Sequence, residues 1–440
     1  MPEGPTGPHD QSAVPPVIGD PETRAEGTRR GGARRGKARK RHTVGKVLLS
    51  TMVVLGMVTG LGTVWLYRDL NHNLDVVDVA DQLYDVPDKP ESTEPQEPLN
   101  ILVMGSDDRD GSGNNIDGLT GSGQRSDTTL LFHLSGDRKS AYGVSIPRDS
   151  LVTRPDCIGD DGETIEGAEN AMWNEAFAVG GPACTIQQFQ TLTDIKVDHF
   201  VVVDFAGFKD MVDAIDGVPV CIPEDISDPA HDIDIKAGTR ELRGKEALNY
   251  VRARYTLGDG SDIGRVKRQQ AFIAAMANKV VSGGVLARPD RLIGFLRAAT
   301  KSLTVDPGLD NFVKISKVGL GFKDIGLSRV RFITIPWAYD TREEYRGRVV
   351  WTEDAERVWN RVLNDKPMSR NLDSGTLDAA NLPGSPSASQ SPSDSESPSD
   401  SESPSGDASP SDDPSASAGT GGSERDEAQR ETLEAAGLCT

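Results

Sequence analysis

The chain has 440 residues and a formal net charge of −20, and its charged and apolar residues are unevenly distributed along it. Its 4 cysteines show no CxxC spacing and its 6 histidines are scattered, which argues against a zinc protein. No GxxxxGK[ST] motif and no GxGxxG after a strand is present, which argues against a nucleotide-binding loop. An acidic C-terminal stretch supplies part of the net charge, so the overall acidity says little about what the folded part binds.

The N-terminal part predicts a membrane anchor. Residues 47–67 (VLLSTMVVLGMVTGLGTVWLY) are 21 uncharged residues, about the length that spans the hydrocarbon core of a bilayer. The run is too long for a signal peptide and ends in Trp65 and Tyr67, which suit the membrane interface, so we predict a retained transmembrane helix. Residues 1–46 end in the basic run RRGGARRGKARKRH, which the positive-inside rule places in the cytoplasm as a disordered segment. A nucleic-acid tail is the alternative for this run, but beside a span a contact with membrane lipid is simpler, and no nucleic-acid partner is expected.

Two further segments resemble linkers. Residues 68–98 are acidic and finally Pro-rich (PDKPESTEPQEP), which predicts an extracellular stalk between the membrane and a domain at residues 99–366. Residues 367–440 are rich in Ser, Pro, Asp and Glu and lack the apolar surface that offsets ordering entropy, which predicts a disordered tail. The helix-like stretch SERDEAQRETLEAAG is the alternative, as a segment of the tail that docks on the domain.

The cysteines agree with export, because disulfides persist outside the cell. We favour a bridge between Cys157 and Cys184, which would close an irregular Gly/Asp-rich insertion, although any pair among these two and Cys221 is possible. Cys439 lies in the predicted tail and is expected to be unpaired.

The predicted domain opens with three short runs typical of strands, NILVMG, TTLLFHL and SAYGVSIP. Consecutive short strands usually pair as neighbours, which predicts an antiparallel meander. Strand alternation then brings Asp107, Arg125, Asp127 and Arg148 to one edge of the sheet. Two carboxylates suit a divalent cation with oxygen ligands and arginines suit phosphate oxygens, whereas the alternative is that these charges only mark the solvated end of a strand.

The second half mixes further strands and helices, so the predicted fold class is α/β, as an α-β-α sandwich with a mixed central sheet. HFVVVDFAGFKDMVDAIDGVPV predicts a strand, a helix and a second strand, and LRGKEALNYV predicts another helix. Asp262 is predicted to cap a long helix that follows, on which Arg265 and Gln269 share one face.

Arginines gather around the N-terminus of this long helix, at Arg252, Arg254, Arg265 and Arg268. Ordinary surface pairing explains some of this charge. A helix N-terminus itself favours anions, however, so a phosphate or pyrophosphate site is the more economical interpretation.

Seven motifs in order resemble the LytR-CpsA-Psr family, especially its actinobacterial members. The motifs are NILVMGSDDR, RSDTTLL, SIPRDS, NEAFAVGGPACT, VDFAGF, LRGKEALNYVRAR and SDIGRVKRQQ. The resemblance covers residues 99–366 and implies a deep apolar pocket for a polyprenyl chain. It also implies the transfer of a glycopolymer from a polyprenyl pyrophosphate carrier onto peptidoglycan through a phosphodiester.

Residue by residue, the resemblance implies that Asp107 and Asp127 hold Mg²⁺ on the pyrophosphate. The implied pyrophosphate-binding residues are Arg125, Arg148, Arg252, Arg254, Arg265, Arg268 and Gln269. Asp262 completes the catalytic set of Asp107, Asp127, Arg148 and Arg265, and would orient or deprotonate the attacking hydroxyl unless a metal-bound oxygen or another carboxylate does so.

Two departures from the family pattern affect the outer phosphate contacts. Met172 or Trp173 stands where a lysine is often found, and the loop between Asp107 and Asp127 is longer than in many relatives.

The predicted function is therefore that of a membrane-anchored, Mg²⁺-dependent glycopolymer phosphotransferase in cell-wall assembly. A metal and arginines that neutralise charge on the leaving phosphate supply most of such catalysis, so no Ser-His or Cys-His nucleophile is needed. The alternatives are a non-catalytic lipid-glycan binding or regulatory protein, and a hydrolase that releases the polymer.

Overall fold

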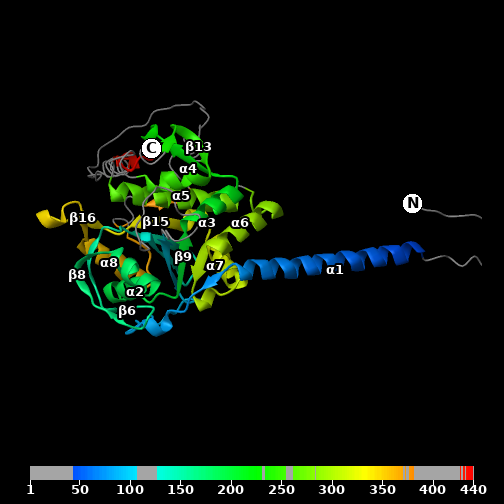
Figure 1. The fold of residues 1–440 in the computed structure, drawn as a ribbon, viewed down its shortest axis with the longest axis horizontal. Helices are drawn as coiled ribbons and strands as arrows, with labels where there is room; N and C mark the ends of the chain where they lie inside the picture. Colours follow the sequence, from blue (N-terminus) through cyan, green and yellow to red (C-terminus); the bar gives the residue numbers. More distant parts are fainter. Residues whose placement is uncertain are drawn as a thin grey trace, which may run out of the picture. The chain divides into compact units, whose positions relative to one another are not determined.

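The computed structural model describes residues 43–106, 126–229, 233–253, 261–282, 284–369, 372, 376–380, 427, 430–431 and 433–439 (Figure 1). Helix α1 (Thr43–His72) contains the predicted span and is, within these residues, the one helix long and apolar enough to cross a membrane. The chain divides into two compact units, Met1–Gly60 and Leu61–Thr440, so the last turns of α1 belong to the same unit as the domain.

A mixed sheet of eight strands forms the centre of the second unit. In spatial order its strands are β1 (Asp75–Val76), β14 (Leu303–Val305), β9 (His199–Asp204), β2 (Leu99–Ser106), β3 (Ser126–Leu134), β4 (Ala141–Ile146), β15 (Val330–Thr334) and β18 (Leu377–Asp378). The predicted meander is confirmed, because β3 pairs antiparallel with both β2 and β4. Strands β9 and β15 lie parallel to β2 and β4 on either side of the meander, so the sheet is mixed as predicted.

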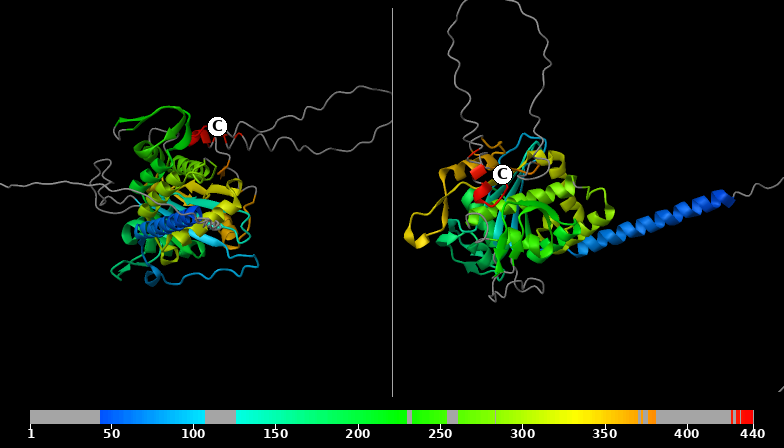
Figure 2. Two further views of the ribbon diagram at one scale, coloured as in Figure 1. Left: turned by 90° about the vertical axis from the view of Figure 1, so that its right-hand side faces the viewer. Right: turned by 90° about the horizontal axis from the view of Figure 1, so that it is seen from above.

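Side-chain alternation along the central strands divides the core in two. On β2, Ile101 packs in one cluster and its neighbour Leu102 in the other, and Leu130 and Leu131 of β3 divide in the same way. The helices of the first face are α3 (Phe205–Ala214), α4 (Gly244–Arg252), α5 (Asp262–Ser282), α6 (Pro289–Ser302) and α7 (Phe312–Ile325). The helices of the second face are α2 (Glu175–Thr193) and α8 (Glu353–Leu363). The two helical layers lie on opposite faces of the sheet, as the α-β-α prediction requires (Figures 1 and 2).

Smaller two-stranded sheets surround this sandwich. They are β10 (Val218–Ile222) with β13 (Gly238–Leu242), β11 (Ile226–Asp228) with β12 (Ile233–Ile235), β16 (Trp337–Tyr339) with β17 (Val349–Trp351), β5 (Leu151–Arg154) with β8 (Ala168–Met172), and β6 (Cys157–Ile158) with β7 (Thr164–Ile165). The predicted strand, helix and strand within residues 199–220 are confirmed as β9, α3 and β10.

The prediction of a stalk at residues 68–98 is wrong. Strand β1 pairs in parallel with β14 at the edge of the main sheet, and Leu70 and Val79 are buried. Further along, Lys89 forms an ion pair with Asp198, with 2.7 Å between Nζ and Oδ1. The acidic and Pro-rich composition predicted a linker, but its few apolar side chains pack on the domain. The domain therefore starts where α1 ends.

The prediction for the C-terminal part is also wrong in two places. Strand β18 adds to the edge of the main sheet beside β15, and Leu433, Ala436 and Leu438 are buried in the first core cluster. The favoured bridge between Cys157 and Cys184 is confirmed, but Cys439, which we expected to be unpaired, forms a disulfide with Cys221 of β10. The stretch SERDEAQRETLEAAG overlaps this docked end, so the docking alternative was the better interpretation.

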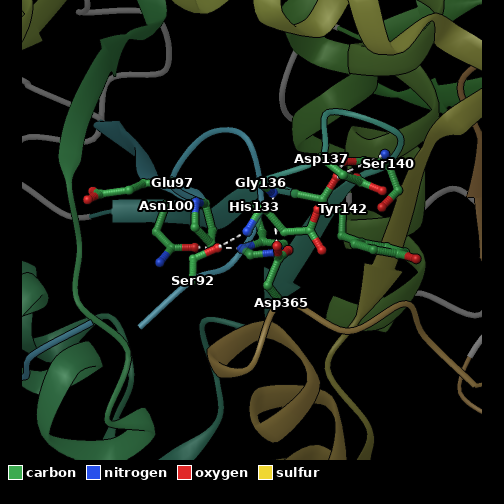
Figure 3. A network of polar contacts seen from close by, with 12 residues as sticks. Ser92, Glu97, Asn100, His133, Gly136, Asp137, Ser140, Tyr142 and Asp365 are labelled. Atoms are coloured by element: carbon green, nitrogen blue, oxygen red, sulfur yellow. Dashed lines mark hydrogen bonds and ion pairs between the residues drawn. The ribbon is translucent and has the colours of Figure 1, made fainter. Parts of the chain in front are cut away.

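A buried histidine lies at the end of the sheet where β2 begins and β3 ends (Figure 3). His133 of β3 lies between two oxygens, with Nδ1 at 2.8 Å from Oδ1 of Asn100 and Nε2 at 3.0 Å from Oδ1 of Asp365. Asn100 donates from Nδ2 to the Lys196 carbonyl, which turns its Oδ1 toward the ring. The other Asp365 oxygen accepts from the Gly136 backbone N–H at 2.9 Å. This network ties β2, β3 and the segment after α8 together.

Candidate active site

The opposite end of the same strands is where the sequence analysis expects Asp107, Arg125, Asp127 and Arg148 to meet. Strand β2 ends at Ser106, which is in register with Ser126 of β3 and with Asp204 of β9. The pairing of β2 with β3 shifts at this point, and the Asp127 backbone falls between the registered residues Ser126 and Thr128. Such an irregularity re-aims side chains at the ends of strands and is common beside active sites. Asp107, Arg125 and the Asp127 side chain lie outside the described residues.

Helix α5 brings its N-terminus to this edge. Gln270 donates from Nε2 to Oγ of Ser145 on β4 and to Oγ1 of Thr334 on β15, at 2.9 and 3.1 Å. The prediction that Asp262 caps α5 is wrong, because Ser261 accepts the Gly264 N–H on its Oγ and Asp262 is the first residue of the helix. With Ser261 in the capping position, the Asp262 carboxylate faces arginines instead of the helix backbone.

Three arginines share two aspartates at the centre of the candidate site. Asp262 lies 3.5 Å from Nε of Arg148 and also pairs with Nη2 of Arg265 through the same oxygen, Oδ1. Asp149 lies 3.6 Å from Nε of Arg148 and 2.8 Å from Nη1 of Arg348. Among these five side chains the positive charges outnumber the negative ones. Because Arg265 is nearly fully buried, water screens its charge only weakly.

Arg252 approaches the same edge from the end of α4. Its guanidinium lies over the ring of Phe205, with 5.3 Å between Cζ and the ring centroid. Phe205 follows Asp204 at the end of β9, and its ring borders Gly105 near the end of β2. Gln269 of α5 donates from Nε2 to the Val251 carbonyl at 3.2 Å, which fixes the end of α4 against α5. Gln269, predicted to bind pyrophosphate, therefore also positions Arg252.

Arg268 has a structural role that the sequence analysis did not foresee. Its side chain is buried at 0% exposure, and Nη2 donates to the Ala253 carbonyl. Its Nη1 donates to the Ala436 carbonyl of the C-terminal segment at 2.9 Å. We therefore leave Arg268 out of the proposed phosphate-binding set. Arg254, which follows Ala253, lies outside the described residues.

Three residues of the site were missed. Asp149 stands within the motif SIPRDS, whereas Arg348 comes from about 200 residues further along the chain, and no local pattern marks it. Asn174 donates its backbone N–H to the Arg148 carbonyl, and its buried Oδ1 has no hydrogen-bond partner in the described part of the chain. At the position of the missing lysine, Trp173 is buried and donates from Nε1 to Thr129.

The comparison with known proteins agrees with this geometry. Residues 69–364 match the model of the LytR_cpsA_psr family. The chain belongs to the LytR-CpsA-Psr family. The fold is also found in a solved structure: protein gbs0355 from Streptococcus agalactiae superposes with a TM-score of 0.51 at 26% identity, over 64% of this chain and 91% of that one.

Curated relatives carry names from cell-wall synthesis. The chain is 35% identical to the probable cell wall biosynthesis protein LcpB of Corynebacterium glutamicum over 51% of this chain and 52% of the relative. It is 29% identical to TagV of Bacillus subtilis, named a polyisoprenyl-teichoic acid–peptidoglycan teichoic acid transferase, over 57% of this chain and 62% of that protein. The chain thus spans about half to two thirds of the length of these relatives.

Proposed function

We propose that this LytR-CpsA-Psr protein is a membrane-anchored phosphotransferase that moves a glycopolymer from a polyprenyl pyrophosphate carrier onto peptidoglycan. The observation that carries the proposal is the group of Arg148, Arg265 and Arg348 around two shared aspartates. A pyrophosphate would bring negatively charged oxygens to a place where three guanidinium groups lie together. The domain would lie outside the cytoplasm, because the basic run precedes α1.

The proposed reaction makes and breaks one P–O bond. The hydroxyl oxygen of the peptidoglycan acceptor attacks the phosphorus that carries the polymer, and the bond from this phosphorus to the bridging oxygen breaks. Polyprenyl phosphate leaves with the electron pair, and the hydroxyl proton passes to Asp262 or to solvent. The arginines neutralise the charge that grows on the leaving phosphate, and this is the main catalytic requirement of phosphoryl transfer.

The magnesium part of the proposal rests on Asp107 and Asp127. No group of three or more His, Cys, Asp or Glu that could hold a metal is present in the residues the structure describes, which include neither Asp107 nor the Asp127 side chain. The backbone fits a metal pair, because Ser106 and Ser126 lie opposite each other and each precedes one of these aspartates. Carboxylate oxygens are the ligands that Mg²⁺ prefers. The ion would neutralise the pyrophosphate while the arginines orient it.

Incubation of the full chain with a synthetic polyprenyl pyrophosphate glycan and wall fragments tests both parts. We expect Mg²⁺-dependent transfer in the unmodified protein and its loss in Asp127→Asn, which keeps the size of the side chain but removes the charge that a hard cation needs. Asp354→Asn, at an exposed aspartate of α8, is the matched control and should transfer normally.

Each other outcome points to a different function. Release of free polymer in the absence of an acceptor product would indicate the hydrolase. Binding of the lipid glycan without turnover, unchanged in Asp127→Asn, would indicate the non-catalytic binding or regulatory protein. Transfer by a folded Asp127→Asn variant at the unmodified rate would contradict the metal assignment.

A further inference from the structure

The domain follows the membrane helix without a spacer. Asp69 of α1 forms an ion pair with Arg297 of α6, with 2.7 Å between Oδ2 and Nε, and Asn71 accepts the Phe312 N–H of α7 on its Oδ1 at 2.9 Å. The apolar run ends at Tyr67, and each helical residue adds about 1.5 Å. The first residue of α7 therefore lies within about 10 Å of the end of the membrane span, at the level of the lipid headgroups.

An aromatic residue marks the membrane interface at this junction. The Arg297 guanidinium lies over the ring of Trp65, with 4.9 Å between Cζ and the centroid. Tryptophan near the end of a span prefers the headgroup layer, and arginine beside it suits lipid phosphates. Through Trp65, Asp69 and Asn71, the last turns of α1 hold α6 and α7 close to that layer.

The outward face of α7 carries two exposed apolar side chains. Val313 and Leu320, two turns apart, are 45% and 51% exposed, and Lys317 lies between them on the same face. Lys323 is exposed one turn after Leu320. Of the whole helix only Ile325 is buried, although the helix is rich in apolar residues. An apolar stripe accompanied by lysines is typical of a helix that lies in a membrane surface.

We propose that α7 is a membrane-contact helix. Val313 and Leu320 enter the headgroup layer of the outer leaflet, and Lys317 and Lys323 bind the phosphates of anionic lipids. A second copy of the chain could also cover an apolar face. The hydrogen bond between α7 and the end of α1, however, places this face of α7 beside the bilayer. The proposal stands independently of the transferase activity.

Depth measurement in vesicles tests it with the full chain. The four cysteines form two disulfides, so Val313→Cys provides one free thiol for an environment-sensitive fluorophore. The matched control is Tyr339→Cys, at a residue that is 53% exposed. Its strand, β16, lies on the far side of the domain from the α1 junction (Figure 1). In vesicles of phosphatidylcholine and phosphatidylglycerol, we expect blue-shifted fluorescence emission at position 313. Lipids that carry a nitroxide on the headgroup should quench most of this emission. Position 339 should show neither.

Charge reversal tests the lysines. Lys317→Glu with Lys323→Glu should reduce quenching at position 313, and vesicles of phosphatidylcholine alone should reduce it in the same direction. Arg346→Glu with Arg357→Glu, the same change of charge at exposed positions elsewhere, should leave it unchanged. Equal quenching at positions 313 and 339 would overturn the proposal. Blue-shifted emission without quenching would also overturn it, since another protein surface would then cover α7.

Discussion

The two ends of the central strands carry polar clusters of opposite kinds. At one end His133 lies between Oδ1 of Asn100 and Oδ1 of Asp365, and the other Asp365 oxygen accepts from the Gly136 N–H. At the other end, three arginines share Asp149 and Asp262. The first cluster links separate segments of the chain and holds strands together, whereas the second gathers three guanidinium groups, which suit an anionic ligand. Residue types alone would not separate the two, because both combine basic and acidic side chains.

The difference predicts that activity and stability separate between the two ends. The largest effect is expected for Arg148→Lys, which keeps the charge but loses the planar fork that contacts two phosphate oxygens at once. We expect the transfer rate to fall about 100-fold or more. The melting temperature in detergent should stay close to that of the unmodified protein, because an ammonium can still pair with Asp262.

Arg357→Lys, at an exposed arginine of α8, is the control for Arg148→Lys and should change neither quantity. Normal transfer by a folded Arg148→Lys protein would mean that the arginine cluster is as structural as the histidine network.

The C-terminal segment supplies the next test, because it reaches the arginine end through Arg268. Replacement of both Cys221 and Cys439 by Ser opens a disulfide between residues 218 positions apart. We expect the free energy of unfolding to fall by about 3–5 kcal/mol, since a long loop gains much entropy in the unfolded chain. Urea unfolding with intact Cys157–Cys184 measures it.

The same replacement at Cys157 and Cys184, which are 27 positions apart, should cost less, about 3 kcal/mol. An unchanged midpoint after loss of the Cys221–Cys439 bridge is the result that a disordered tail would give, and it would contradict the docking of this segment.

Features that rest on local patterns were predictable from the sequence. The short strand-like runs of β2, β3 and β4 and their connections predicted the meander, and the spacing of Arg265 and Gln269 placed both on α5. What was missed depends on distant partners. Asp75–Val76 becomes a strand only because Leu303–Val305 lies beside it, and Arg348 meets Asp149 across 199 positions. Composition also misled us where a few apolar residues, such as Val79 and Leu438, anchor otherwise polar segments.

For the His133 cluster we expect the reverse of the arginine cluster, namely lower stability with unchanged transfer. Asp365→Ala leaves the buried His133 ring and the Gly136 N–H without their acceptor, which should lower the free energy of unfolding by about 2–3 kcal/mol. Transfer per folded molecule should remain unchanged, because the network lies at the far end of β2 and β3. Chemical unfolding and the transfer assay on the same preparation measure both quantities.

Asp354→Ala, an exposed aspartate of α8, serves as the control for Asp365→Ala and should be within about 0.5 kcal/mol of the unmodified protein. Loss of transfer in a well-folded Asp365→Ala protein would show that the two ends are coupled, and the contrast between them would fail.

The smallest expected effect concerns Lys267, a further buried cation on α5, two residues after Arg265. Burial lowers the pKa of Lys267 to about 8, from 10.5 for an exposed lysine. At neutral pH the group is charged in both the folded and the unfolded chain. As the pH rises above about 8, the folded state releases the proton while the unfolded state keeps it, so the unfolded chain binds more protons and stability grows with pH. The gain from this group should be at most about 1.4 kcal/mol per pH unit, and it should end as the pH passes the unfolded pKa.

Urea unfolding between about pH 7 and pH 9.5 should therefore show a steeper rise of the free energy of unfolding for the unmodified protein than for Lys267→Met. Lys139→Met, at an exposed position, is the control. Parallel curves for all three proteins would mean that Lys267 does not titrate in this range. The buried charge of Lys267 would then not destabilise the folded state.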